Sequence, residues 1–224
     1  MSQSDSFIDE VTEEVRRDRL FATFRRYGWI AAVVVVVIVA GAAWYEYTRA
    51  EREAQAEAFG DAILTALEQG EPGERAAALD AIGADTPDAA AMLGLTRAAE
   101  MARSGDTQGA VDELNRVAET GEVPVVYRSL AKFRALALQA DTLSPAERRD
   151  GYQDLAGAGS PLRLLALEQI AMTHVEEGNP GEALAQLRDM QEDAGMTPDL
   201  LRRISQLIVV LGGTPGEADT TQDG

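Results

Sequence analysis

Residues 160–190 have the sequence SPLRLLALEQIAMTHVEEGNPGEALAQLRDM, which contains one complete structural unit of the chain. Apolar residues recur every three or four positions in its first half and again in its second half, which is typical of two amphipathic helices. Between them, the run GNPG at residues 178–181 contains residues that end one helix and start the next. Asn179 and Glu182 predict a capping box at the start of the second helix. The segment therefore predicts two helices joined by a tight turn.

The same unit recurs every 37 residues, and a proline marks each recurrence. Proline at the first helical position costs little, because the amide that it lacks would have no partner there. Ser or Thr precedes three of these prolines, as expected of helix N-caps. Helix, tight turn, helix at this period is typical of an α-solenoid, in which helix pairs stack side by side. The marker prolines are Pro87, Pro124, Pro161 and Pro198.

The rest of the C-terminal region fits the same plan. The first unit turns at residues 104–106 (SGD), and the middle unit has a capping box at residues 144–147 (SPAE). Ahead of them, residues 46–69 predict one long helix, followed by a short partner helix after Pro72. A last single helix, residues 198–211, is expected to cover the open end of the solenoid. We therefore predict an all-α fold with about four helix pairs and a C-terminal capping helix.

A different kind of segment lies nearer the N-terminus. Residues 29–45 contain no charged side chain, include five consecutive valines and begin and end with aromatic residues. At about 1.5 Å per residue, these 17 residues make a helix of about 26 Å, just enough to cross a bilayer core. Tryptophan and tyrosine at both edges suit the headgroup region. The segment therefore predicts a single transmembrane helix.

The charges on either side of this segment predict its orientation. Five arginines lie within residues 1–28, and few basic residues follow the segment closely, so the positive-inside rule leaves residues 1–28 in the cytoplasm and exports residues 46–212. Residues 213–224 are expected to be a disordered tail. A cleaved signal peptide is the competing interpretation, since AGA at residues 40–42 resembles a cleavage site. The N-terminal arm is either a short interfacial helix or a solvated segment.

The composition argues against several classes of function. The chain has 38 acidic and 20 basic side chains, and a net charge of −18 argues against binding to nucleic acid. It has no cysteine and one histidine, which leaves no thiolate or histidine-rich metal site. Acidic neighbours at residues 112–113, 176–177 and 192–193 point in different directions on a helix, so they are expected to be solvated. We therefore expect no metal, no cofactor and no enzymatic activity, with His174 as a packing residue.

Two units carry small and apolar residues at equivalent positions: Ala98, Gly105, Ala110 and Leu114 in one, and Ala171, Gly178, Ala183 and Leu187 in the other. This pattern resembles that of tetratricopeptide repeats, in which small residues let paired helices pack closely. The aromatic residues of such repeats are largely missing. Gly94 and Leu167 occupy the tryptophan position, and Met101 and His174 occupy the tyrosine position. The resemblance therefore implies degenerate repeats.

The layout of the whole chain resembles a narrower family. Its N-terminus is first acidic and then basic, with RRYGW at residues 25–29, and its apolar segment ends in GAAWY at residues 41–45. Together with the degenerate repeats, these features are similar to the ancillary subunit of the bacterial SecYEG translocon. The resemblance implies an inner-membrane anchor, a periplasmic domain that passes emerging proteins to chaperones, and no catalytic residues. Its implied partners are translocon subunits, periplasmic chaperones or secreted proteins, with lipid around residues 29–45.

In an α-solenoid, the first helices of the pairs line a concave groove that binds peptides. Six residues are placed in this groove by their repeat positions, and the four basic ones either form a positive patch or pair with nearby acids. Two other hypotheses remain open: a scaffold in another envelope pathway, such as cell division or outer-membrane or cytochrome assembly, and an anchored enzyme that uses the single histidine. The candidate groove residues are Arg97, Met101, Arg128, Lys132, Arg134 and His174.

Overall fold

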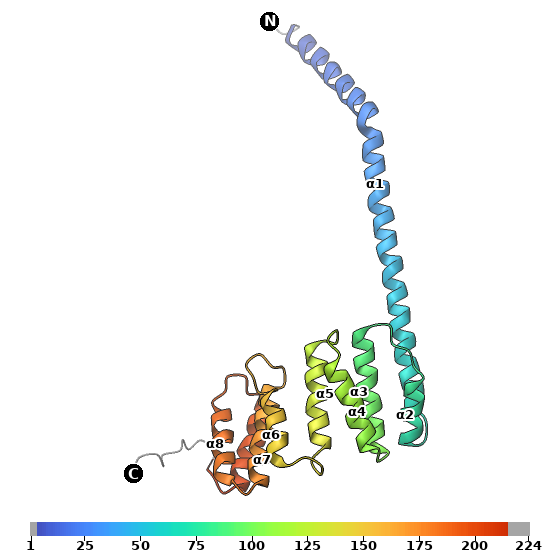
Figure 1. The fold of residues 1–224 in the computed structure, drawn as a ribbon. Helices are drawn as coiled ribbons and strands as arrows, with labels where there is room; N and C mark the ends of the chain where they lie inside the picture. Colours follow the sequence, from blue (N-terminus) through green and yellow to red (C-terminus); the bar gives the residue numbers. More distant parts are fainter. Residues whose placement is uncertain (1–3, 215–224) are drawn as a thin grey trace. The chain divides into compact units, whose positions relative to one another are not determined.

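The computed structural model describes the backbone of residues 4–214 and the side chains of residues 29, 30 and 32–214. Within residues 4–214 all regular structure is α-helical, with nine helices and no strand (Figure 1). The predicted all-α fold is therefore confirmed for this part of the chain. The side chains of the predicted N-terminal arm and residues 215–224 of the predicted tail lie outside the described residues.

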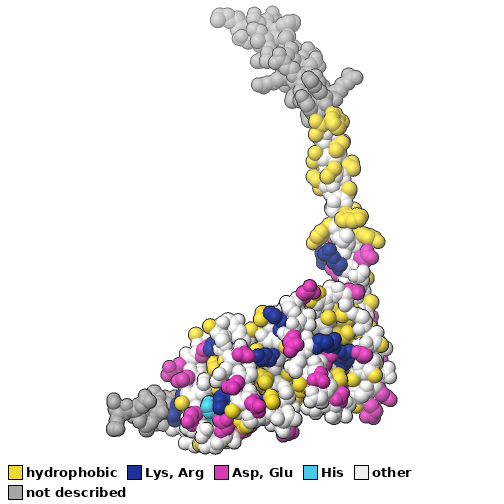
Figure 2. Space-filling view, in the orientation of Figure 1, with side chains coloured by type: hydrophobic (Ala, Val, Ile, Leu, Met, Phe, Trp, Pro, Cys, Tyr) yellow, Lys and Arg dark blue, Asp and Glu magenta, His cyan; other side chains and the backbone are white. Residues whose placement is uncertain are grey.

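Packing contacts divide the chain into two units, Met1–Gly60 and Asp61–Gly224. The first helix, α1 (Ser4–Leu67), contains a part, Ala32–Leu67, that is long and apolar enough to cross a membrane. Its most apolar stretch is 0% buried, and the Trp44 side chain is 72% exposed. Figure 2 shows hydrophobic side chains along this stretch of the helix. Such a surface is what a helix surrounded by lipid presents.

The second unit contains the end of α1 and a series of shorter helices, each packed against the next from α2 onward. The first helices of two successive pairs also meet, since α3 contacts α5. Figure 1 shows these helices side by side, which is the stack of pairs that the 37-residue repeat predicts. The helices are α2 (Pro72–Asp80), α3 (Pro87–Arg103), α4 (Thr107–Glu119), α5 (Val125–Leu138), α6 (Pro145–Gln153), α7 (Arg163–Glu176), α8 (Pro180–Gln191) and α9 (Pro198–Val210).

Several helices begin with the capping chemistry that the sequence predicts. The hydroxyls of Thr86 and Thr197 accept backbone amide hydrogen bonds of 3.2 and 3.3 Å at the starts of α3 and α9, and a proline follows each threonine. At α6 the predicted capping box is present. The Ser144 hydroxyl accepts a bond from the Glu147 amide at 3.3 Å, and the Glu147 carboxylate accepts one from the Ser144 amide at 2.9 Å.

Three helix starts differ from the prediction. Pro124 is the N-cap of α5 and not its first residue, and Pro161 lies two residues before Arg163, where α7 begins. The capping box predicted at Asn179 is wrong, because the Asn179 side chain makes no capping hydrogen bond. Its backbone amide instead bonds to the His174 carbonyl at 2.9 Å in the turn that ends α7. Asp106 follows the equivalent turn with a ψ of 67°, and its side chain still accepts a hydrogen bond from the Gly109 amide at 3.0 Å, so the turn by itself does not exclude capping.

Glycines make the turns inside the first and third units. Gly105 and Gly178 have φ angles of +89° and +79°, which residues with a side chain rarely adopt. The Gly105 amide donates to the Ala102 carbonyl at 3.2 Å, and the following amide donates to the Met101 carbonyl at 3.0 Å. The equivalent distances at Gly178 are 3.0 and 2.9 Å. Both turns are Schellman motifs, which satisfy the last carbonyls of α3 and α7 and reverse the chain within a few residues.

Small and aliphatic side chains fill the contacts between the helices. One cluster joins α3, α4 and α5, a second joins α7, α8 and α9, and a third around Tyr152 joins α5, α6 and α7. In α9 the buried residues Leu200, Ile204 and Ile208 are spaced by four, so one face of this helix packs on the stack. Helix α9 therefore covers the end of the solenoid, as the sequence predicts.

Helices α3 and α4 approach each other closely at Gly94. A Cβ atom at this position would lie 2.7 Å from Val117 Cγ2 and 2.8 Å from Glu113 Oε1. Both neighbours are buried, at 6% and 7% exposure, so neither moves away freely. Glycine is therefore required for the packing of this pair.

A Gly94→Ala variant is expected to lower the free energy of unfolding by about 1–3 kcal/mol, because the added methyl forces α3 and α4 apart. Thermal and urea unfolding, followed by circular dichroism, measure the change. Gly181→Ala in α8 is the matched control, since nothing lies within 4 Å of its Cβ position. We expect the control to be neutral or stabilising by up to about 1 kcal/mol. Equal effects of the two variants would contradict the close approach.

Candidate protein-interaction surface

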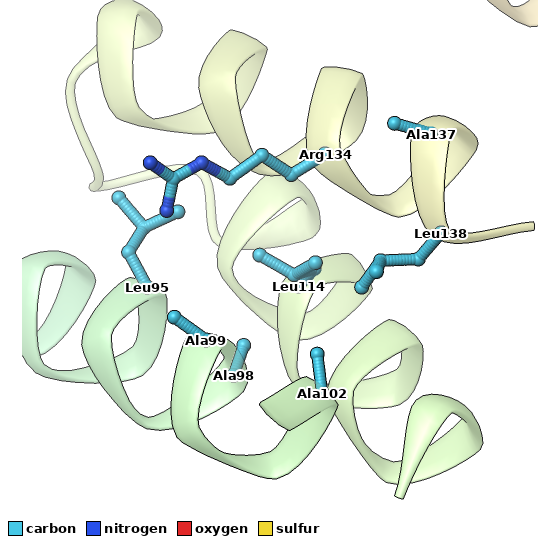
Figure 3. Close-up of a pocket in the computed structure, with 8 residues that line it drawn as sticks. All are labelled: Leu95, Ala98, Ala99, Ala102, Leu114, Arg134, Ala137 and Leu138. Carbon is cyan, nitrogen blue, oxygen red and sulfur yellow. The ribbon is translucent and has the colours of Figure 1, made fainter. Parts of the chain in front are cut away.

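Helices α3, α4 and α5 line an open pocket of about 270 Å³ (Figure 3). Its walls are leucine and alanine side chains of α3, α4 and α5, together with one arginine. Ala98, Ala99 and Ala102 lie on the α3 side, and their small side chains leave the space open. The Arg134 side chain extends from α5 toward Leu95 of α3 (Figure 3). The pocket is therefore apolar, with a cation beside it.

A second pocket, of about 400 Å³, shares Leu95, Ala99 and Arg134 with the first. It extends to Tyr127 on α5 and to Leu67 at the end of α1. The two pockets adjoin at these shared residues, and we name the surface that they line together the α3–α5 groove. Its residues are Leu67, Met92, Leu95, Thr96, Ala98, Ala99, Glu100, Ala102, Arg103, Leu114, Tyr127, Leu130, Arg134, Ala137 and Leu138.

Two of the four basic candidates from the sequence are engaged in ion pairs. Arg97 of α3 pairs with Asp80, which ends α2, and with Glu113 of α4. Lys132 of α5 places its Nζ 2.5 Å from Oδ2 of Asp154, which follows α6. Both side chains therefore neutralise acids of neighbouring helices, which is one of the two alternatives that the sequence left open.

The other two basic candidates, Arg128 and Arg134, make no ion pair with a described side chain. The Arg128 Nε is buried without a hydrogen-bond partner in the described part of the chain, and the Arg134 side chain is exposed. Met101 packs against the cluster between α3, α4 and α5, and His174 is 23% exposed on α7. Of the six candidates, all of which are described, Arg134 alone lines the α3–α5 groove.

Buried carboxylates are a feature that the sequence analysis missed. Glu100, Glu113 and Glu168 are only 2%, 7% and 6% exposed, and arginines from other helices hold each of them. The expectation that residues 112–113 are both solvated is wrong for Glu113, because α4 packs this side on α3 while Asp112 remains exposed. The pairs between helices are Arg75–Glu100, Arg97–Glu113 and Arg203–Glu168.

A second polar cluster joins α6 to α7. Arg148 is 5% exposed and pairs with Glu176, and the Arg149 Nη1 lies 2.5 Å from Glu177 Oε2. The hydrogen bond from Arg149 lowers the pKa of Glu177. Tyr152 is 0% exposed, and its hydroxyl has no hydrogen-bond partner among the described residues. Burial raises the pKa of Tyr152, with Arg148 opposing this effect.

Because its pKa is raised in the folded state, Tyr152 supports folding at neutral pH and loses that contribution as pH increases. Above a pH of about 10, an unfolded chain releases the phenol proton while the folded chain retains it, so alkali favours unfolding. In a Tyr152→Phe variant, the free energy of unfolding is expected to fall less steeply than in the natural chain as the pH rises above about 10. At pH 7 the variant should match the natural chain within about 1 kcal/mol, since the lost hydroxyl is unpaired.

Urea unfolding between pH 7 and pH 11 measures this difference. Tyr127→Phe on α5 is the control for the loss of a phenol from a partly exposed site. If Tyr152→Phe loses as much stability in alkali as the natural chain does, the buried phenol is not the group responsible.

The described side chains indicate which contacts this surface can make. No group of three or more His, Asp or Glu side chains in the described part is arranged to hold a metal ion. His174 Nδ1 lies 4.0 Å from Glu177 Oε2, and Arg149 already binds that carboxylate. The α3–α5 groove offers alkyl side chains, a tyrosine and two exposed arginines, Arg103, which pairs with Glu100, and Arg134. Such a surface makes apolar and charge-assisted contacts with a ligand.

The comparisons with known proteins agree with this fold. A family model described as a tetratricopeptide repeat-like domain matches residues 20–150. The matched region includes the apolar part of α1 as well as α2 to α5, and it exceeds half of the 224 residues. No curated protein and no solved structure matched the chain. Domains of this type typically mediate contacts between proteins. The extent of the match and the stack of helix pairs together show that this chain belongs to the tetratricopeptide repeat-like family.

Proposed function

We propose that this protein is a membrane-anchored scaffold that holds other polypeptides at the periplasmic face of a bacterial inner membrane. In this proposal residues 29–45 cross the membrane, residues 1–28 lie in the cytoplasm, and residues 46–212 form the periplasmic domain, with residues 213–224 as a tail. The observation that carries the proposal is the combination, in one chain, of an unburied apolar helix and a tetratricopeptide repeat-like domain with an apolar groove.

Two features support the anchor. The apolar stretch of α1 has large exposed side chains throughout, with Trp29 65% exposed near its start and Tyr47 65% exposed beyond its end. In water this much apolar surface is unfavourable by about 25 cal/mol for each Å², whereas lipid removes that cost. Aromatic rings at both edges and arginines on the N-terminal side are the pattern of a single span with a cytoplasmic N-terminus.

The groove supports the scaffold function. An apolar surface formed by the first helices of stacked pairs suits the binding of an extended or helical segment of another protein. Anchoring beside a source of such segments increases their local concentration, so weak contacts give useful occupancy. The resemblance to the ancillary subunit of the SecYEG translocon makes the secretion channel the source we propose, with translocon subunits, periplasmic chaperones and secreted proteins as partners.

The membrane topology has a direct test, because the chain contains no cysteine. Single-cysteine variants Ser2→Cys and Asn115→Cys are treated in intact cells and in spheroplasts with a maleimide that does not cross membranes. We expect labelling of Asn115→Cys in spheroplasts and labelling of Ser2→Cys only after lysis. The opposite pattern would overturn the orientation. A mature protein shorter by about 40 residues on an immunoblot would favour the cleaved signal peptide.

Cross-linking in cells tests the proposed partners. A photo-reactive amino acid is placed at Tyr47 beside the span, at Thr96 in the α3–α5 groove, or at Asn115 on the exposed side of α4 as the matched control. We expect Tyr47 to capture translocon subunits and Thr96 to capture chaperones or secreted proteins, with little capture at Asn115. Capture of only cell-division or cytochrome-assembly proteins would place the scaffold in another envelope pathway and overturn the translocon assignment.

A further inference from the structure

We propose that the α3–α5 groove binds a segment of a partner polypeptide in which an aspartate or glutamate lies between large apolar residues, with the carboxylate on Arg134. The inference rests on the proposed function, since it assumes that the groove holds polypeptides. It specifies which side chains the bound segment carries, and these follow from the residues that line the groove and from the charges of those residues.

The lining of the first pocket favours apolar side chains as its contents. Apart from Arg134, the residues around this volume of about 270 Å³ are leucine and alanine. Ala98, Ala99 and Ala102 create this space where larger side chains would fill it, and Leu95 and Leu114 form further apolar wall. An aliphatic side chain that enters the pocket therefore exchanges water contacts for apolar contacts.

The charge of the groove favours an acidic residue next to the aliphatic side chain that enters the first pocket. Arg134 lines both pockets and has no ion pair with a described residue, although the chain as a whole has 38 acidic side chains. Glu100 is the acid of the groove, and both Arg75 and Arg103 already bind it. A carboxylate of the bound segment can therefore pair with the Arg134 guanidinium at the edge of the apolar surface. Hydrogen bonds between two charged groups are stronger than those between neutral groups.

The position of Arg134 favours an acidic side chain within the segment over a free C-terminus. Leu95, Ala99 and Arg134 are common to the two pockets, so Arg134 lies at their junction. Beyond this junction the groove continues to Tyr127 and Leu67. A segment in the groove can therefore pass Arg134 and place one apolar side chain in each pocket, with its carboxylate between them.

Fluorescent peptides provide the test, with the full chain reconstituted in lipid nanodiscs and binding measured by fluorescence anisotropy. The first peptide has two leucines on each side of a glutamate, Gly-Ser flanks and an amidated C-terminus. In a second peptide glutamine replaces glutamate, and in a third lysine replaces it. A fourth peptide contains glutamine and ends in a free carboxylate directly after the leucines.

We expect the natural chain to bind the glutamate peptide about tenfold more tightly than the glutamine peptide, and to bind the lysine peptide least, because one charge-assisted contact is gained. In Arg134→Gln this preference should disappear, and in Arg134→Glu the lysine peptide should bind best. Ala99→Leu, which fills the junction of the pockets, should weaken all four peptides. Arg202→Gln is the matched control, since Arg202 pairs with Asp199 on its own helix.

Equal affinity for the glutamate and glutamine peptides would overturn the inference, and so would a preference that survives in Arg134→Gln. Tighter binding of the fourth peptide than of the first would show recognition of a chain terminus and would also overturn it. These outcomes differ from failure of the proposed function, which appears as absent cross-links at Thr96 in cells whatever the peptides do.

Discussion

An Ile204→Ala variant is expected to lower the free energy of unfolding by about 2–5 kcal/mol, which is the usual cost of truncating a fully buried isoleucine. Ile204 is 0% exposed and lies in the cluster between α7, α8 and α9. A loss of this size is a large part of the stability of a typical domain, about 5–15 kcal/mol. It is expected to act first on α9, because each element of a solenoid is stabilised mainly by its immediate neighbours.

Urea unfolding of the full chain and hydrogen exchange of individual amides measure this effect. We expect the amides of α9 to exchange faster in the variant, then those of α8, while the amides of α3 and α4 change least. Val210→Ala is the matched control, since Val210 lies on the same helix and is 81% exposed. It should change the free energy by less than about 0.5 kcal/mol. Similar losses in both variants would show that α9 does not cap the stack through its buried face.

An Arg75→Met variant is expected to lower the free energy of unfolding by about 2–4 kcal/mol, because it leaves a buried carboxylate with a single, exposed partner. Arg75 Nε lies 2.7 Å from Glu100 Oε2, and Glu100 is 2% exposed. Arg75 Nη1 also donates to the carbonyls of Gln69 and Gly70, at 3.2 and 2.9 Å, in the turn before α2. The remaining partner of Glu100 is Arg103, which is 64% exposed.

A double variant separates the ion pair from other effects of the substitution. Arg75→Met combined with Glu100→Leu should recover most of the lost stability, since no buried charge then remains unpaired. Arg202→Met is the control for loss of an exposed pair, in which Arg202 and Asp199 are 67% and 89% exposed, and it should cost less than about 1 kcal/mol. A double variant that is less stable than Arg75→Met alone would contradict the proposed role of the buried charge.

The helices and turns of this protein could be predicted from the sequence because their causes are local. The spacing of apolar residues, the Thr86 cap and the Ser144–Glu147 box depend on neighbours a few residues away. The left-handed Gly105 likewise follows from the end of the helix that precedes it. The local signal is insufficient at Asn179, whose side chain makes no capping hydrogen bond, although Asp106 after the equivalent turn caps α4.

Pairings between distant residues depend on which faces meet, and only the packed structure provides that information. Arg75 and Glu100 are 25 positions apart, and Arg203 and Glu168 are 35 apart, distances at which no sequence period relates them. Packing between helices also decides which of the basic candidates line the groove. Arg97, Lys132 and Arg134 have similar predicted positions, but packing directs two of them to acids and leaves Arg134 beside the pockets. Local spacing therefore determines the stack of helices, whereas contacts between helices determine which charges are free to bind.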